Sequence, residues 1–171
     1  ARNRAAMCAN EILGTTSLTV LNFPDNRMDG VELLDVVKAV ETFIAEHRPN
    51  VVITHFSNDV NIDHQITHQA VVVACRPQPN HCVEELLFME IVSSTEWIPV
   101  TGQVPFSPNY WVDITESIDI KMEALNAYKD ELREFPHPRS VEGVKALSIW
   151  RGCAVGVASA ESFIVGRIIA K

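Results

Sequence analysis

One segment of the sequence concentrates side chains that can bind a metal ion or transfer a proton. These side chains are His55, Asp59, Asn61, Asp63, His64 and, one helical turn later, His68. Zinc favours imidazole nitrogen and carboxylate oxygen, and a hydrolytic zinc site keeps one position open for water. The segment therefore predicts either a metal-assisted hydrolytic site or a set of ordinary polar loop residues, and composition alone favours the second.

Two known metal motifs are only partly present. Asp59-Val-Asn-Ile-Asp63 resembles the first half of a calcium loop, which then needs glycine at its sixth position and glutamate at its twelfth. Those positions are His64 and Ala70, so a calcium loop is excluded. His64 and His68 would share one face of a helix, as in H-E-x-x-H, but the general-base glutamate of that motif is absent. The segment supplies one or two zinc ligands at most.

Other kinds of chemistry find little support. The glycine-rich motifs that bind dinucleotides or nucleotide phosphates are absent, as is the G-x-S-x-G nucleophile motif. The cysteines have no C-x-x-C spacing and are Cys8, Cys75, Cys82 and Cys153. We expect them to be small buried hydrophobic side chains in a reducing compartment, which predicts a cytoplasmic protein.

Length and charge limit the remaining classes. The 171 residues suit a single domain over 1–171. The formal net charge of -8 comes from 22 acidic against 14 basic residues, and no basic stripe is present, so we expect no nucleic-acid partner. No apolar run approaches the ~20 residues that span a bilayer. The oligomeric state stays open, and a homo-oligomer is compatible with the sequence.

Helical and extended patterns alternate along the chain. Apolar residues recur at helical spacing from Leu33 to Ile44, and Arg48-Pro49 ends that helix. Val51 to Thr54 is a β-branched run typical of a strand buried on both faces. The other expected helices span 5–13, 63–75, 116–134 and a segment that begins near Ser140, and the other expected strands span 18–23, 85–92 and 111–114.

This alternation predicts an α/β fold with a parallel sheet and crossover helices. In open α/β sheets, ligands bind in loops beyond the carboxyl ends of the strands. The polar segment that begins at His55 directly follows the most apolar strand. We therefore expect the candidate site at that edge of the sheet.

The segment from Asn61-Ile-Asp-His64 to His68-Gln-Ala-Val71 resembles a motif of the PIG-L/LmbE-like de-N-acetylases. These are zinc hydrolases of N-acetylglucosaminyl conjugates, such as GlcNAc-phosphatidylinositol, and of related amides. Further similar segments follow in the family's order along nearly the whole chain: Arg2 to Gly14, Leu21 to Asp25, Ser93 to Trp97, Phe106 to Asn109, Val112 to Ile114, Pro136 to Ser140, Arg151-Gly152 and Ala160 to Phe163.

The resemblance implies a Rossmann-like three-layer sandwich with a mostly parallel sheet and a zinc ion held by two histidines and an aspartate. His64 matches the third of these ligands, and Asp63 matches the adjacent aspartate that orients a catalytic group. Asn61 stands where many members have a histidine that stabilises the oxyanion or protonates the leaving amine. The family's H-P-D-D-E motif does not occur in this sequence. We expect it, with the first strand, in a preceding segment.

Three further residues are expected in the site. Asparagine can donate a hydrogen bond but supplies no proton at neutral pH, so the proton donor must be another residue. His137, between two prolines, is our prediction for it, with an ordinary loop histidine as the alternative. Arg2 and Arg139 are expected to bind substrate hydroxyls, a phosphate or the departing acetate, with solvated surface arginines as an equal alternative.

The predicted function is removal of an acetyl group from a small-molecule N-acetyl sugar conjugate, giving a free amine and acetate. Zinc is the expected cofactor, and another divalent metal would suit the same ligands. Two alternatives stay open. The chain could be a catalytically inactive Rossmann-like carbohydrate-binding protein, or an amidase acting on a non-sugar amide.

Overall fold

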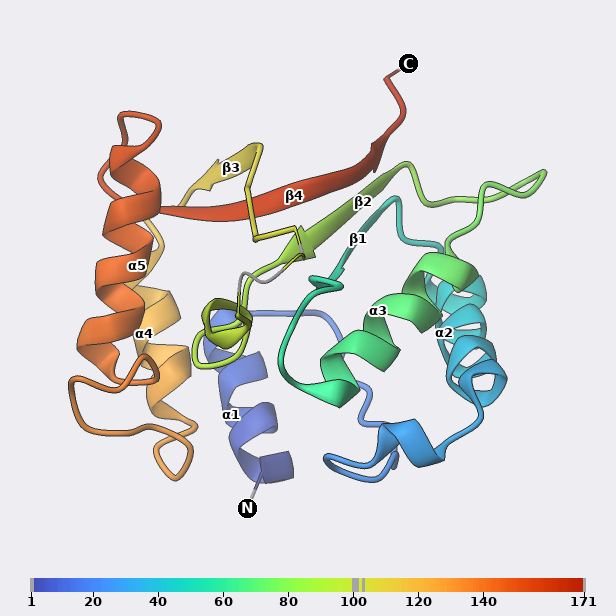
Figure 1. Cartoon of the computed structure of the whole chain (residues 1–171), viewed down its shortest axis with the longest axis horizontal. Helices are drawn as coiled ribbons and strands as arrows, with labels where there is room; N and C mark the ends of the chain where they lie inside the picture. Colours follow the sequence, from blue (N-terminus) through green and yellow to red (C-terminus); the bar gives the residue numbers. More distant parts are fainter. Residues whose placement is uncertain (1, 100–101, 103, 171) are drawn as a thin grey trace. The chain divides into compact units, whose positions relative to one another are not determined.

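Helices and strands form two units in the computed structural model, which describes residues 2–99, 102 and 104–170 (Figure 1). Unit 1 comprises Ala1–Asn22 and Trp111–Glu161, and unit 2 comprises Phe23–Tyr110 and Ser162–Lys171. The expectation of one domain over the whole chain stays a prediction.

Unit 2 contains the parallel strand pair. Its elements are η1 (Met28–Gly30), α2 (Leu33–His47), β1 (Val51–His55), α3 (Ile62–Ala74), β2 (Glu85–Met89) and η2 (Thr95–Trp97). β1 and β2 are parallel, with Val51 opposite Glu85 and His55 opposite Met89. The carboxyl ends of both strands therefore meet at one edge of the sheet.

A third strand gives the sheet its antiparallel part. β4 (Ala160–Ile168) runs antiparallel to β2, from Glu85 opposite Ile168 to Met89 opposite Phe163, with an irregularity between Leu86 and Leu87. The strand order is β1-β2-β4-β3. The α/β class is confirmed, and the sheet combines a parallel and an antiparallel pair where we expected mostly parallel strands.

Helix α2 follows its sequence pattern closely. Val36 and Val37, each 3% exposed, pack with Met28 and Ala70 in one core cluster. Arg48 ends the helix in the left-handed conformation (φ 48°), and its backbone N–H donates to the carbonyl of Ile44. Pro49 cannot continue the helix, so the expected boundary is confirmed.

Strand β1 is buried on one face rather than two. Alternate side chains of a strand point to opposite faces of the sheet. Val52 packs against the second core cluster, formed by Val71, Cys75, Val83 and Leu86. Val51 and Ile53, on the other face, are 39% and 49% exposed. The prediction of burial on both faces is therefore wrong.

Unit 1 is mainly helical. Its elements are α1 (Arg2–Leu13), β3 (Tyr110–Asp113, whose first residue belongs to unit 2), α4 (Ile118–Asn126) and α5 (Val141–Cys153). α4 packs against both α1 and α5. Gly14 follows α1 with φ 66°, a conformation that favours glycine. Ser140 caps α5, because its Oγ accepts a hydrogen bond from Gly143 N at 2.9 Å. Both helix-boundary predictions are confirmed.

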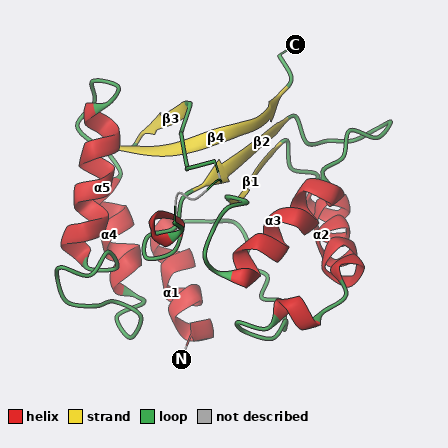
Figure 2. Cartoon of the chain, in the orientation of Figure 1, coloured by secondary structure: helices red, strands yellow, loops and turns green. Residues whose placement is uncertain are grey.

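Two predicted elements differ in the structure. The strand expected at 18–23 is a loop (Figure 2), in which Leu18, Val20 and Leu21 are 43–49% exposed. The pattern has the composition of a strand, but no described strand pairs with it. The helix expected over 116–134 ends at Asn126. Beyond it the backbone bonds shorten to three-residue spacing, as in Tyr128 N to Leu125 O, and form turns.

The cysteines and the membrane expectation can be compared directly with the structure. Cys75 is buried and Cys82 half-buried, but Cys8 and Cys153 are exposed, so burial of all four is wrong. All four are free thiols. No helix of the described ranges is long and apolar enough to cross a membrane.

Candidate active site

The candidate site lies where two parallel strands end. Residues 56–61 connect β1 to α3, and residues 90–94 connect β2 to η2. Both connections belong to unit 2. The structure therefore brings the polar segment of the sequence to the carboxyl edge of the sheet, as expected.

Asn61 sets the start of α3. Its Oδ1 accepts hydrogen bonds from Asp63 N at 2.8 Å and from His64 N at 3.4 Å, which makes Asn61, and not Asp63, the N-cap. Its Nδ2 donates to Asn26 Oδ1 at 3.4 Å. The side chain thus fixes the backbone that carries Asp63 and His64.

Asp63 ties the helix to a neighbouring loop. Its carboxylate accepts from Asn26 N at 2.6 Å and from Met28 N at 2.9 Å. Asn26 has a positive φ of 54°, and the carboxylate stabilises this turn. The predicted role of Asp63 beside a catalytic group stays a prediction, since the oxygens already bind backbone.

His64 has one ring nitrogen engaged. Its Nδ1 lies 3.1 Å from Asp59 Oδ1 and 3.4 Å from Ser94 Oγ. Its ring stacks on that of His55 with centroids 4.2 Å apart and planes inclined by 18°. The side chain is 20% exposed, so it is largely enclosed by residues of its own unit.

Asp59 is the residue of this site whose role the sequence did not reveal. It is fully buried and accepts hydrogen bonds from Asn61 N (2.8 Å), Thr95 Oγ1 (2.8 Å) and Ser94 Oγ. Burial raises the pKa of this carboxyl, but the hydrogen bonds from His64, Ser94, Asn61 N and Thr95 lower it further, to about 2. Asp59 is therefore ionised at neutral pH. Its one local signal is its place two residues before the helix cap, where an aspartate commonly forms such a turn.

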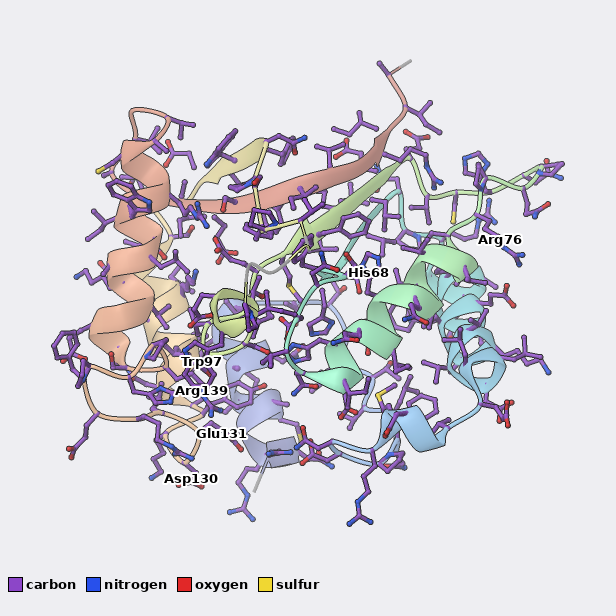
Figure 3. The ribbon with its side chains drawn as sticks, viewed as in Figure 1. His68, Arg76, Trp97, Asp130, Glu131 and Arg139 are labelled. Atoms are coloured by element: carbon purple, nitrogen blue, oxygen red, sulfur yellow. The ribbon has the colours of Figure 1, made fainter. Side chains whose placement is uncertain are left out.

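His68 is held by the end of β1. Its Nδ1 lies 2.9 Å from the carbonyl oxygen of His55, which can only accept, so Nδ1 donates. Its ring packs on Phe88 at 4.6 Å (His68 is labelled in Figure 3). The predicted distinction between His64 as metal ligand and His68 as neighbour stays a prediction.

His55 gives unfolding a specific pH dependence. Burial, then the charge of His64, lowers the pKa of His55 to about 4; Asp59 opposes the shift and His68 adds to it. Unfolded histidine titrates near 6.5, so between about pH 6.5 and 4 only the unfolded chain takes up this proton. We expect the free energy of unfolding of the metal-free protein to fall as pH falls through this window, with His55 contributing on the order of 2 kcal/mol.

The test is urea unfolding at several pH values in that window. His55→Phe keeps a ring against His64 but removes the titrating group, so its stability should depend less on pH than that of the parent. Equal slopes in the two proteins would contradict the low pKa of His55.

The described residues fit one ligand position of a metal site. No three His, Cys, Asp or Glu side chains in the described ranges come together as a metal-binding group. His64 alone has the usual features of a ligand, because its Nδ1 contacts a carboxylate and its Nε2 is left for an ion. Further ligands would have to come from outside these residues.

The remaining predicted residues lie in unit 1. Arg2 Nε donates to Glu131 Oε1 at 2.8 Å, and Arg139 Nη1 lies 3.7 Å from Glu131 Oε2 (Figure 3). The hydrogen bond from Arg2 holds the pKa of Glu131 below its usual value. The structure thus brings the two predicted arginines to one carboxylate. His137 is next to them in sequence, and its Nδ1 accepts from Arg139 N at 3.0 Å.

Comparison with known proteins supports the motif resemblance. Residues 1–75 match the PIG-L family model, described as GlcNAc-PI de-N-acetylase. The predicted resemblance is therefore confirmed. No curated protein matches the sequence.

Solved structures share the fold. The conserved protein TT1542 from Thermus thermophilus is 26% identical with a TM-score of 0.77, and the match covers 99% of this chain and 74% of that one. N,N'-diacetylchitobiose deacetylase from Pyrococcus horikoshii is 16% identical with a TM-score of 0.72, covering 96% of this chain and 62% of that one. GalB, the 4-carboxy-2-hydroxymuconate hydratase of Pseudomonas putida KT2440, is 19% identical with a TM-score of 0.77, covering 99% and 72%. The fold thus occurs in proteins of different named activities.

Proposed function

Because residues 1–75 carry the sequence pattern of the PIG-L family, we propose that the protein is a zinc-dependent hydrolase that removes the acetyl group from an N-acetylated sugar. The products are acetate and a free amine on the sugar. Another divalent metal would suit the same ligand chemistry. The deacetylase among the solved structures of this fold is compatible with this reaction.

The observation that carries the proposal is the placement of His64. It follows a buried strand at the carboxyl edge of the sheet, where α/β enzymes bind their ligands. Its Nδ1 contacts the buried carboxylate of Asp59, and its Nε2 is the nitrogen that would bind the ion. An ordinary polar loop histidine has no need of a fully buried carboxylate.

The roles of the chain's own residues follow from their hydrogen bonds. When bound, zinc polarises the acetamide carbonyl and lowers the pKa of its water towards ~7. Asn61 positions the first turn of α3 and carries no acidic proton. His137 supplies the proton to the departing amine, because its Nδ1 accepts a hydrogen bond and its Nε2 then carries the hydrogen. Asp63 secures the turn beside Asn61.

Arg2 and Arg139 are the proposed substrate-binding residues. A guanidinium has five N–H donors, so an arginine that pairs with Glu131 retains donors for sugar hydroxyls, a phosphate or acetate. Two arginines on one carboxylate also leave a net positive charge, which favours an anionic group.

The proposal requires ligands that these residues do not provide. The H-P-D-D-E motif that the resemblance implies is absent from this sequence, and the chain covers 62–74% of the three solved structures. The full-length protein must therefore contribute the remaining ligands and the general base. Free cysteines support a reducing, cytoplasmic location for it.

The test is a panel of N-acetylated substrates presented to the full-length zinc-loaded protein. We expect the release of a primary amine, detected with an amine-reactive dye, from at least one N-acetylglucosaminyl conjugate. Binding of such a sugar without amine release would favour the carbohydrate-binding alternative. Amine release from non-sugar acetamides alone would favour the amidase.

A further inference from the structure

Asp59 contacts the proposed ligand His64 from a fully buried position, and neither the motif resemblance nor the comparisons give it a role. We propose that Asp59, held by Ser94 and Thr95, is a positioning residue that fixes the tautomer and ring orientation of His64, so that Nε2 presents its lone pair to the metal. This inference rests on the proposed function, in which His64 binds the ion.

The hydrogen bonds around Asp59 decide which ring nitrogen of His64 carries the proton. Asp59 Oδ1 accepts from the backbone N–H of Asn61 at 2.8 Å, and that group can only donate. A carboxylate oxygen in this position acts as an acceptor. His64 Nδ1, 3.1 Å away, must then be the donor, and the neutral ring keeps its lone pair on Nε2. This is the tautomer that a metal ion needs.

Thr95 fixes the other oxygen of the carboxylate. Its Oγ1 accepts from Ile91 N at 2.8 Å and directs its own hydrogen to Asp59 Oδ2 at 2.8 Å. Its backbone N–H donates to Ile91 O at 2.9 Å. Asp59 is thus linked to the turn that follows β2, while His64 lies on the helix that follows β1. The two strand ends are joined through this one carboxylate.

The ring of His64 is restrained on a second side. His55, the last residue of β1, stacks on it with centroids 4.2 Å apart. Rotation of the imidazole would break both this stacking and the contact with Asp59. The neighbouring aspartate cannot replace this restraint, because the oxygens of Asp63 accept from Asn26 N and Met28 N.

The first experiment reads the tautomer directly in the unmodified, metal-free full-length protein. Long-range proton–nitrogen NMR separates a protonated ring nitrogen from one with a free lone pair. We expect His64 to carry its hydrogen on Nδ1, with Nε2 free, near neutral pH. A hydrogen on Nε2 with Nδ1 free would overturn the proposal, and this result does not depend on any variant folding.

The second experiment measures zinc affinity by competition with a chelator. Asp59→Asn can turn its amide N–H towards Nδ1 and so shift the ring hydrogen to Nε2; the dissociation constant for zinc should rise about 10–100-fold, as for other carboxylates that orient ligand histidines. Asp113→Asn is the matched control. Asp113 also accepts hydrogen bonds, from Thr115 N and Oγ1, but lies in unit 1, and this variant should bind zinc like the parent.

Failure of the positioning role and failure of the proposed function give different results. If the parent binds zinc, His64→Ala loses it and Asp59→Asn, with near-ultraviolet circular dichroism like that of the parent, binds it equally well, only the role of Asp59 is wrong. If the parent itself binds no zinc, the metal chemistry of the proposed function is wrong as well. A cobalt-loaded parent and Asp59→Asn with identical visible spectra would also argue against positioning.

Discussion

Replacing His64 by alanine in the full-length protein should strip the zinc and reduce acetate release to background. His64 is the one described residue whose ring nitrogen is prepared for an ion by a buried carboxylate. Loss of one of three protein ligands leaves too few to hold a catalytic zinc. Metal analysis of the purified variant, together with an acetate assay, measures both effects.

His68→Ala is the matched comparison for this variant. His68 lies four residues further along α3, a rise of about 6 Å, and its Nδ1 donates to the carbonyl of His55. It should therefore keep the metal, with some loss of stability because the ring packs on Phe88. Stoichiometric zinc and retained activity in His64→Ala, or zinc loss in a folded His68→Ala, would show that the ligand has been misassigned.

Replacing His137 by alanine should lower kcat on the order of 10²-fold while changing KM little, a typical loss for a general acid. Asn61 cannot supply the proton, and its Oδ1 is engaged as the cap of α3. His137 Nδ1 accepts from Arg139 N, so the hydrogen of the neutral ring is on Nε2. One limb of the pH–rate profile should flatten in the variant, which steady-state kinetics across pH will show.

His81→Ala provides the control for this prediction. His81 is another loop histidine, exposed, with Nδ1 2.9 Å from Gln78 O. Its removal should leave kcat and the pH profile as they are in the parent. If His137→Ala behaves in the same way, the proton donor is a different residue.

The sequence predicted those parts of the fold that depend on local signals. The end of α2 at Arg48 follows from the proline after it, and the start of α5 follows from the hydroxyl of Ser140. The carboxyl end of β1 and the polar segment behind it were also found, because a β-branched run and a cluster of ligand-type side chains are visible without tertiary information.

The parts that failed depend on partners far away in sequence. The run at 18–23 has the residues of a strand, yet a strand needs a neighbour for its backbone hydrogen bonds, and no described strand supplies one. β4 was missed although Ile164 and Val165 are typical strand residues, since it becomes a strand by pairing with β2. Asp59 gains its environment from Ser94 and Thr95, which are 35 and 36 residues away.

The most direct test of the central claim is acetate release from an N-acetylglucosaminyl conjugate by the full-length protein, before chelation, after chelation and after zinc is restored. We predict release with an equal amount of free amine, loss of both on chelation, and recovery of both with zinc. Release that is unaffected by complete metal removal would contradict the metal-dependent mechanism. No release from any N-acetylated sugar by the zinc-loaded protein would contradict the proposed function itself.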